Sequence, residues 1–131
     1  MHPSQHLSEV VARSADDVYA FAADPRHLPQ WAAGLSGSIA QVDGQWVARS
    51  PMGRVVVEPA PPNDFGVLDH VVVLPSGERV YNPLRVLPLD DGCEVVFSLR
   101  RRPGLSDDDL AQDAAAVRAD LQALKRLMEA G

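Results

Sequence analysis

The sequence predicts one α+β domain in which an antiparallel sheet surrounds a long C-terminal helix. The 131 residues suit a single domain with its own core. Short strand-like runs separated by turn residues fill the middle of the chain, and a regular apolar stripe fills its last part. Strands joined by short turns must pair antiparallel, so this order indicates a sheet that one large helix covers.

The N-terminal part predicts a strand followed by two short helices. Residues 5–12 form the strand-like run. Ser14 stands three residues before Asp17, which is typical of a capped helix start, and Pro25 ends this helix because the residue before a proline avoids helical geometry. A second short helix is expected over 26–33, so that the two helices form a bent pair across one end of the sheet.

The middle of the chain predicts six strands. Asp43-Gly44 is a two-residue hairpin signal, and further turn clusters contain Pro, Gly, Asn and Asp. The strands between these turns are expected at 38–42, 45–50, 54–58, 66–74, 79–87 and 93–102.

The last part predicts one continuous helix over 106–129. Ser106 is the expected cap, and three aspartates follow it in the first turn, where the helix dipole favours negative charge. Apolar residues then recur every three or four positions, which places one stripe along a helix about 36 Å long. The stripe consists of Leu110, Ala114, Val117, Leu121, Leu124 and Met128.

This order of elements predicts an internal cavity. A single helix about 10 Å wide cannot cover seven strands. The chain has only 2 Trp, 2 Tyr and 3 Phe to fill the remaining concave space. We therefore expect part of the core to stay hollow, and apolar hollows of this kind bind small molecules.

Three stretches of sequence carry a resemblance to a known superfamily. The run SADDVYAFAADPRHLPQWAAGL, the strand series and the terminal GLSDDDLAQDAAAVRADLQALKRLMEA together resemble the START-like, Bet v 1-like (SRPBCC) helix-grip superfamily. The polyketide cyclase/dehydrase and lipid-transport-like branch is the nearest. The resemblance implies a single domain over 1–131, with a seven-stranded curved antiparallel sheet (β-α-α-β6-α) around the C-terminal helix. It implies no particular reaction, because carriers, cyclases, hydrolases and receptors share this fold.

Strand alternation selects three polar residues for the cavity wall. Glu9 shares a face of its strand with apolar neighbours, and Asn82 does the same in 79–87. The two faces of 66–74 are almost equally apolar. Burying an aspartate costs more free energy than burying a neutral imidazole, so we expect the side chain of His70, rather than that of Asp69, to point into the cavity.

Three aromatic residues complete the expected ligand-binding set. Phe97 lies on the apolar face of its strand, while Trp31 and Trp46 either line the cavity or pack as core. Cys93 is expected to be a small buried apolar residue rather than a nucleophile.

Composition and motifs argue against several classes of function. The formal net charge of −6 disfavours nucleic acid as a partner. The sequence contains no HExxH, GxSxG, P-loop or GxGxxG motif, and we expect neither metal nor cofactor. It shows neither a signal-peptide pattern nor an apolar run long enough to span a membrane, so we expect a cytoplasmic protein without integral membrane association.

Three functions stay open. A carrier or sensor of a small hydrophobic molecule, such as a lipid or polyketide-like compound, needs only the cavity. A cyclase or dehydratase would need an acid and a base, for which Glu9 and His70 are the catalytic candidates. A protein-interaction module would use the outer sheet face. The chain is expected to be a monomer or a homodimer.

Overall fold

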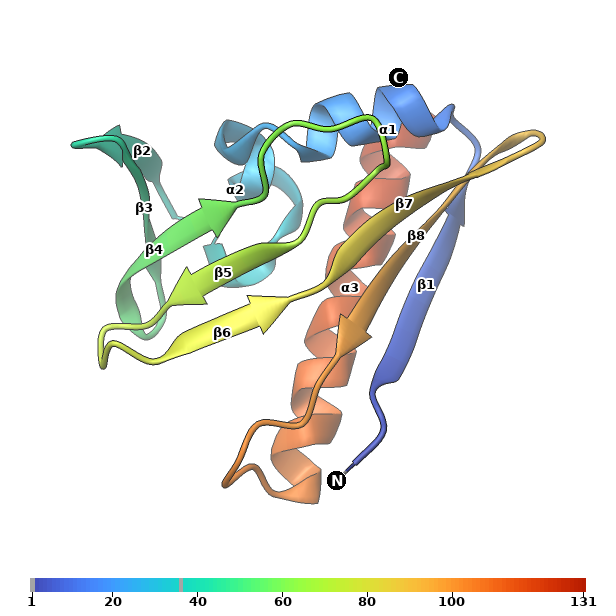
Figure 1. Ribbon diagram of the computed structural model, residues 1–131. Helices are drawn as coiled ribbons and strands as arrows, with labels where there is room; N and C mark the ends of the chain where they lie inside the picture. The colour runs from blue at the N-terminus through green and yellow to red at the C-terminus, as the bar shows by residue number, and fades with distance from the viewer. Residues whose placement is uncertain (1, 36) are drawn as a thin grey trace.

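The computed structural model describes residues 2–35 and 37–131, and it has the helix-grip architecture (Figure 1). In chain order the elements are β1 (Gln5–Val11), α1 (Ala15–Ala22), α2 (Leu28–Trp31), β2 (Ile39–Val42), β3 (Gln45–Ser50), β4 (Gly53–Pro59), β5 (His70–Val73), β6 (Arg79–Asn82), β7 (Leu84–Leu89), β8 (Gly92–Leu99) and α3 (Asp107–Ala130). Short 3₁₀ turns at Pro25–His27 and Ala33–Leu35 flank α2. The predicted α+β fold class is confirmed.

The strands form two antiparallel sheets that meet along one line. One sheet has the order β1-β8-β7, and the other has the order β2-β3-β4-β5-β6. Residues 66–68 join them, since Leu68 N donates to Leu84 O at 2.8 Å and Val86 N donates to Gly66 O at 2.9 Å. The result is one curved layer in front of α3, with α1 and α2 across its upper end (Figure 1).

Two expected strands are each divided where the sheets meet. The expected strand 79–87 is interrupted at Pro83, so that β6 and β7 belong to different sheets. A proline has no N–H to continue the ladder of hydrogen bonds. The expected strand 66–74 divides as well, because 66–68 contact β7 while β5 pairs with β6. The alternation of buried and exposed side chains nevertheless continues across Pro83.

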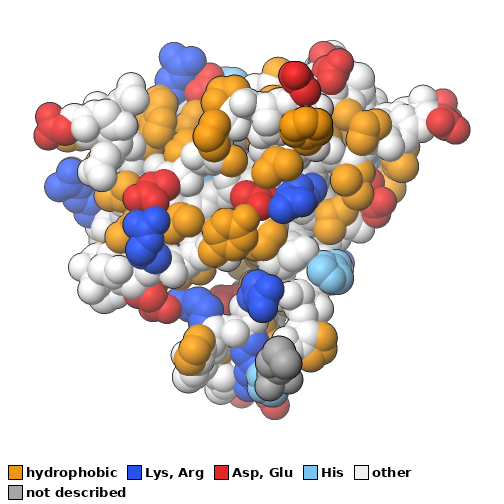
Figure 2. Space-filling model, viewed as in Figure 1, with side chains coloured by type: hydrophobic (Ala, Val, Ile, Leu, Met, Phe, Trp, Pro, Cys, Tyr) orange, Lys and Arg blue, Asp and Glu red, His pale blue; other side chains and the backbone are white. Residues whose placement is uncertain are grey.

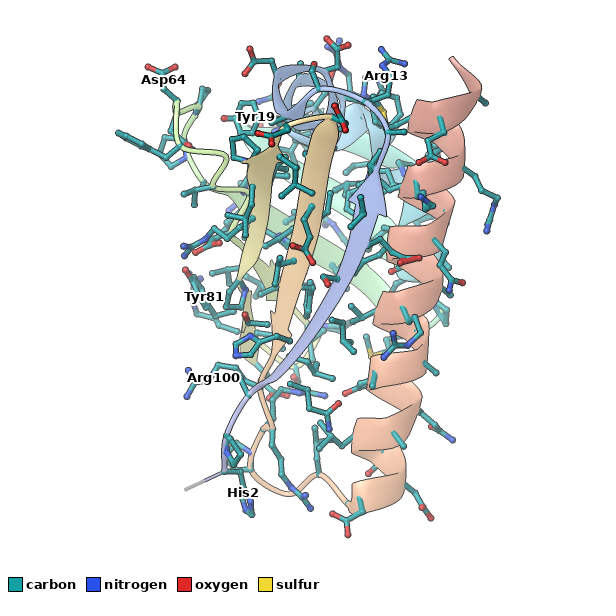
Figure 3. The ribbon with its side chains drawn as sticks, turned by 90° about the vertical axis from the view of Figure 1, so that its right-hand side faces the viewer. His2, Arg13, Tyr19, Asp64, Tyr81 and Arg100 are labelled. Carbon is teal, nitrogen blue, oxygen red and sulfur yellow. The ribbon has the colours of Figure 1, made fainter. Side chains whose placement is uncertain are left out.

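The helices begin at the residues that the sequence indicates. Ser14 Oγ accepts from Asp17 N at 3.1 Å, and Ser106 with Asp109 forms a complete capping box at the start of α3. At its other end α3 is tied to the β1–α1 connection, where Arg13 Nη1 donates to Met128 O at 2.9 Å (Figure 3). Within the described residues, no helix combines the length and apolar character needed to cross a membrane.

The apolar stripe of α3 is buried unevenly. Leu121, Leu124 and Met128 belong to the core, and Leu124 is 0% exposed. Leu110, Ala114 and Val117, nearer the start of the helix, are only half-buried. The C-terminal half of α3 therefore fills the concave side of the sheet, while its N-terminal half borders open space.

Candidate functional site

A first cavity of about 250 Å³ lies between the helices α1 and α2 and the inner face of the five-stranded sheet. The segment 60–69, which connects β4 to β5, contributes Ala60, Pro62, Val67 and Leu68 to its wall. The lining residues are Tyr19, Ala22, Ala23, Pro25, Leu28, Trp31, Trp46, Val57, Pro59, Ala60, Pro62, Val67, Leu68, His70 and Leu84. No Asp, Glu, Lys or Arg of the described chain is among them, so the wall carries no permanent charge.

His70 supplies the one imidazole among the described residues that line this cavity. Its Nδ1 lies 3.1 Å from Leu68 O, and because a carbonyl oxygen only accepts, Nδ1 carries the proton. Burial lowers the pKa of His70 below its ordinary value of 6.5, which keeps the ring neutral at pH 7. Nε2 is then an unprotonated acceptor, and it has no hydrogen-bond partner among residues 2–35 and 37–131.

The segment 60–69 is held over the cavity by Asn63. The Asn63 side chain bonds to the backbone of its own loop, accepting from Phe65 N and Val67 N and donating to Pro61 O and Val67 O. Its backbone N donates to Tyr19 Oη at 2.9 Å, which ties the loop to α1. Figure 3 shows Tyr19 between α1 and the loop that carries Asp64.

Asp69 departs from the expectation that only one residue of the pair 69–70 is buried. His70 does line the cavity, but Asp69 is also buried, at 7% exposed, on the opposite face. Its carboxylate accepts from Arg85 Nε and Nη2, both at 2.8 Å, from Leu84 N at 2.9 Å and from the Tyr81 hydroxyl. The Arg85 guanidinium holds the pKa of Asp69 well below its usual range. These four bonds offset the cost of burial that we expected to keep the aspartate exposed.

A second, more open cavity of about 480 Å³ lies beside the N-terminal half of α3. Phe97, Val72 and Val117 are part of its apolar wall, and Arg79 and Arg100–Arg102 are among its lining residues. In Figure 2 several basic side chains surround a hollow in the lower part of the visible face. Burial raises the pKa of Asp120 in this wall, and the same carboxylate accepts from Ala33 N at 3.1 Å.

The structure distributes the six expected site residues over three places. Trp31, Trp46 and His70 line the first cavity, and Asn82 and Phe97 line the second. His70 and Asn82 are paired across β5 and β6, so the boundary between the two cavities runs between them. Glu9 is half-buried on the same side of β1 as the buried Leu7 and Val11, but it lines neither cavity.

The sequence did not single out Asp120 as a cavity residue. It lies three residues after Val117, and residues three apart share a face of a helix, so the spacing from the apolar stripe is the signal that could have found it. Cys93 is completely buried, as expected, and burial raises the pKa of its thiol. The described residues contain no cluster of three or more His, Cys, Asp or Glu side chains that could hold a metal ion.

Comparison with known proteins places this fold in a family. The family described as "Polyketide cyclase / dehydrase and lipid transport" matches residues 4–129. No curated protein matches the sequence.

Solved structures share the fold at low sequence identity. A START superfamily protein from Mycobacterium smegmatis is 15% identical, with a TM-score of 0.70, over 98% of this chain and 99% of the other. The protein XoxI from Bacillus cereus is 13% identical, with a TM-score of 0.72, over 97% and 96% of the two chains. Ara h 8.0201 is 12% identical, with a TM-score of 0.68, over 98% of both. At these identities the likeness establishes the fold alone.

Proposed function

Because the chain belongs to the polyketide cyclase/dehydrase and lipid transport family, within the START-like superfamily, we propose that it is a carrier or sensor that binds a small hydrophobic molecule in its first cavity. The observation that carries the proposal is an apolar cavity of about 250 Å³ whose wall holds no charged side chain of the described chain. Such a wall favours apolar ligands, since each buried apolar Å² contributes roughly 25 cal/mol. Its few polar groups can fix the orientation of a ligand.

The arrangement of the candidate acid and base favours a carrier over an enzyme. General acid–base catalysis needs both groups within hydrogen-bond reach of one substrate. His70 lines the first cavity, Glu9 does not, and no other carboxylate of the described chain lines it. A cyclase or dehydratase would therefore have to work with His70 alone among the groups that titrate near neutral pH.

The experiment is a titration followed by tryptophan fluorescence. Trp31 and Trp46 are the only tryptophans of the chain, and both line the first cavity. Compact neutral hydrocarbons, ketones and alcohols should change their emission with 1:1 stoichiometry and Kd values of about 10–100 µM, the range expected for about ten ligand atoms.

A cavity-filling variant makes the test specific. Ala22 lines the first cavity, which has a volume of about 250 Å³, and Ala22→Phe adds a phenyl ring of the size that a cavity of about 150 Å³ accommodates. The variant should remain folded and lose the fluorescence response. Ala20→Phe, on the exposed side of the same helix, is the matched control and should retain it. Unchanged binding by Ala22→Phe would place the ligand elsewhere and refute the proposal.

A further inference from the structure

The polar groups of the first cavity specify a ligand class, an inference that rests on the proposed function. We propose that the ligand is a neutral ring alcohol or phenol of about ten non-hydrogen atoms, whose hydroxyl donates a hydrogen bond to Nε2 of His70. Volume, charge and hydrogen-bonding capacity each contribute a separate constraint.

The volume sets the size of the ligand. A cavity of about 150 Å³ accommodates benzene. The first cavity, at about 250 Å³, is larger by two-thirds. It therefore has room for one ring with substituents or for two fused rings, and not for a long acyl chain or four fused rings.

The absence of charged side chains among the described lining residues sets the charge of the ligand. A carboxylate or phosphate inside this cavity would lose its hydration and find no charged partner, which disfavours its binding. The second cavity differs, because its wall includes Asp120 and several arginines. A neutral molecule is therefore the one that should prefer the first cavity over the second.

The hydrogen-bonding capacity of the wall requires a donor on the ligand. With Nδ1 engaged by Leu68 O, neutral His70 can only accept at Nε2. A ketone or ether has no proton to give and would leave this acceptor unpaired, whereas a hydroxyl supplies one.

A hydroxyl also suits the donors nearby. Tyr19 Oη accepts from Asn63 N, and its own proton has no acceptor among the described residues. Trp31 Nε1 is also buried, and it has no hydrogen-bond partner among residues 2–35 and 37–131. A hydroxyl oxygen can accept from such donors while its proton goes to His70, which a C–H or N-alkyl group cannot do.

Borneol and camphor are suitable probes, because they share one bicyclic carbon skeleton and differ in carrying an alcohol or a ketone. Tryptophan fluorescence should report borneol binding about tenfold tighter than camphor, as one additional buried hydrogen bond implies. In His70→Leu the borneol affinity should fall about tenfold and the camphor affinity by less than threefold, so the preference disappears. Val67→Ala, which removes apolar wall and no polar group, should weaken both compounds alike and preserve the ratio.

A second measurement is independent of whether His70→Leu folds. In ¹⁵N NMR of the unaltered protein, the Nε2 resonance of His70 should shift when borneol is added and stay in place when camphor is added. Equal affinities, together with equal ¹⁵N shifts, would overturn the hydroxyl anchor and leave ligand binding intact. If no neutral compound of this size changes the tryptophan emission, the proposed function itself fails. Tighter binding of the carboxylate analogue camphanic acid would overturn the inference of a neutral ligand.

Discussion

Asp69→Asn tests the contact that fixes the orientation of β5 and so turns His70 into the cavity. The substitution keeps the shape of the side chain and removes its charge. Breaking a buried ion pair costs 3–5 kcal/mol when the remaining charge stays buried. Here the Arg85 side chain is 48% exposed while that of Asp69 is 9% exposed, so water can solvate the freed guanidinium. We therefore expect a loss of about 2 kcal/mol, close to the value of one or two charged hydrogen bonds.

Urea unfolding followed by circular dichroism measures this loss. At pH 7 the midpoint should fall with an unchanged slope, and the melting temperature should drop by about 6–10 °C for a chain of this size. Glu58→Gln is the matched control, because it removes the carboxylate of the exposed Arg79–Glu58 pair in the same sheet. This control should change stability only slightly.

The pH dependence gives a further check on the same residue. The pKa of Asp69 is lowered in the folded protein, so its stabilisation is fully present above its unfolded pKa of about 3.9. It is lost as the pH falls from there through the folded pKa. The gap between the parent and Asp69→Asn should therefore be constant from pH 8 to pH 5 and narrow below about pH 4. A variant as stable as the parent at pH 7 would refute the assignment of Asp69 as a buried, paired carboxylate.

Three more predictions concern the core, the loop and the cavity histidine. Leu124→Ala should cost about 3–4 kcal/mol in urea unfolding, since Leu124 is completely buried; a loss below 1 kcal/mol would show that α3 is not packed as described. Gly66→Ala should destabilise the fold far more than Gly77→Ala: both have positive φ, but a Cβ at Gly66 would overlap Val86 O while one at Gly77 meets nothing within 4 Å. Equal melting temperatures would contradict this close approach. Burial lowers the pKa of His70, so the free energy of unfolding should decline as the pH falls below the pKa of about 6.5 that the residue has in the unfolded chain. His70→Leu should lose part of that decline, measured by urea unfolding at pH 7.5 and 5.5. Identical pH profiles for the parent and the variant would place His70 in water.

Local signals in the sequence predicted the elements of the fold well. The caps at Ser14 and Ser106 and the hairpin at Asp43-Gly44 depend on interactions within a few residues, and all three are confirmed. The division of the sheet at Pro83 was not predicted. A proline in a strand pattern can stand at an edge, at a bulge or at a break, and only the partners of both flanking strands decide between these.

The site was predicted less completely because it depends on contacts between distant segments. The buried faces of 79–87 and 93–102 follow the alternation in the sequence. Alternation could not show that His70 and Asn82 face two separate cavities. The boundary between the cavities depends on how α1, α2 and α3 fill the concave side of the sheet. The buried Asp69 was missed for a similar reason, since its partner Arg85 is sixteen residues away along the chain.

Ligand binding in the first cavity underlies both proposals. Intermolecular nuclear Overhauser effects between unlabelled borneol and isotope-labelled protein test it most directly. We expect contacts from the methyl groups of borneol to Trp31, Trp46 and Leu84, all of which line the first cavity. Contacts confined to Val117 and Phe97, in the second cavity, or to surface side chains would contradict it.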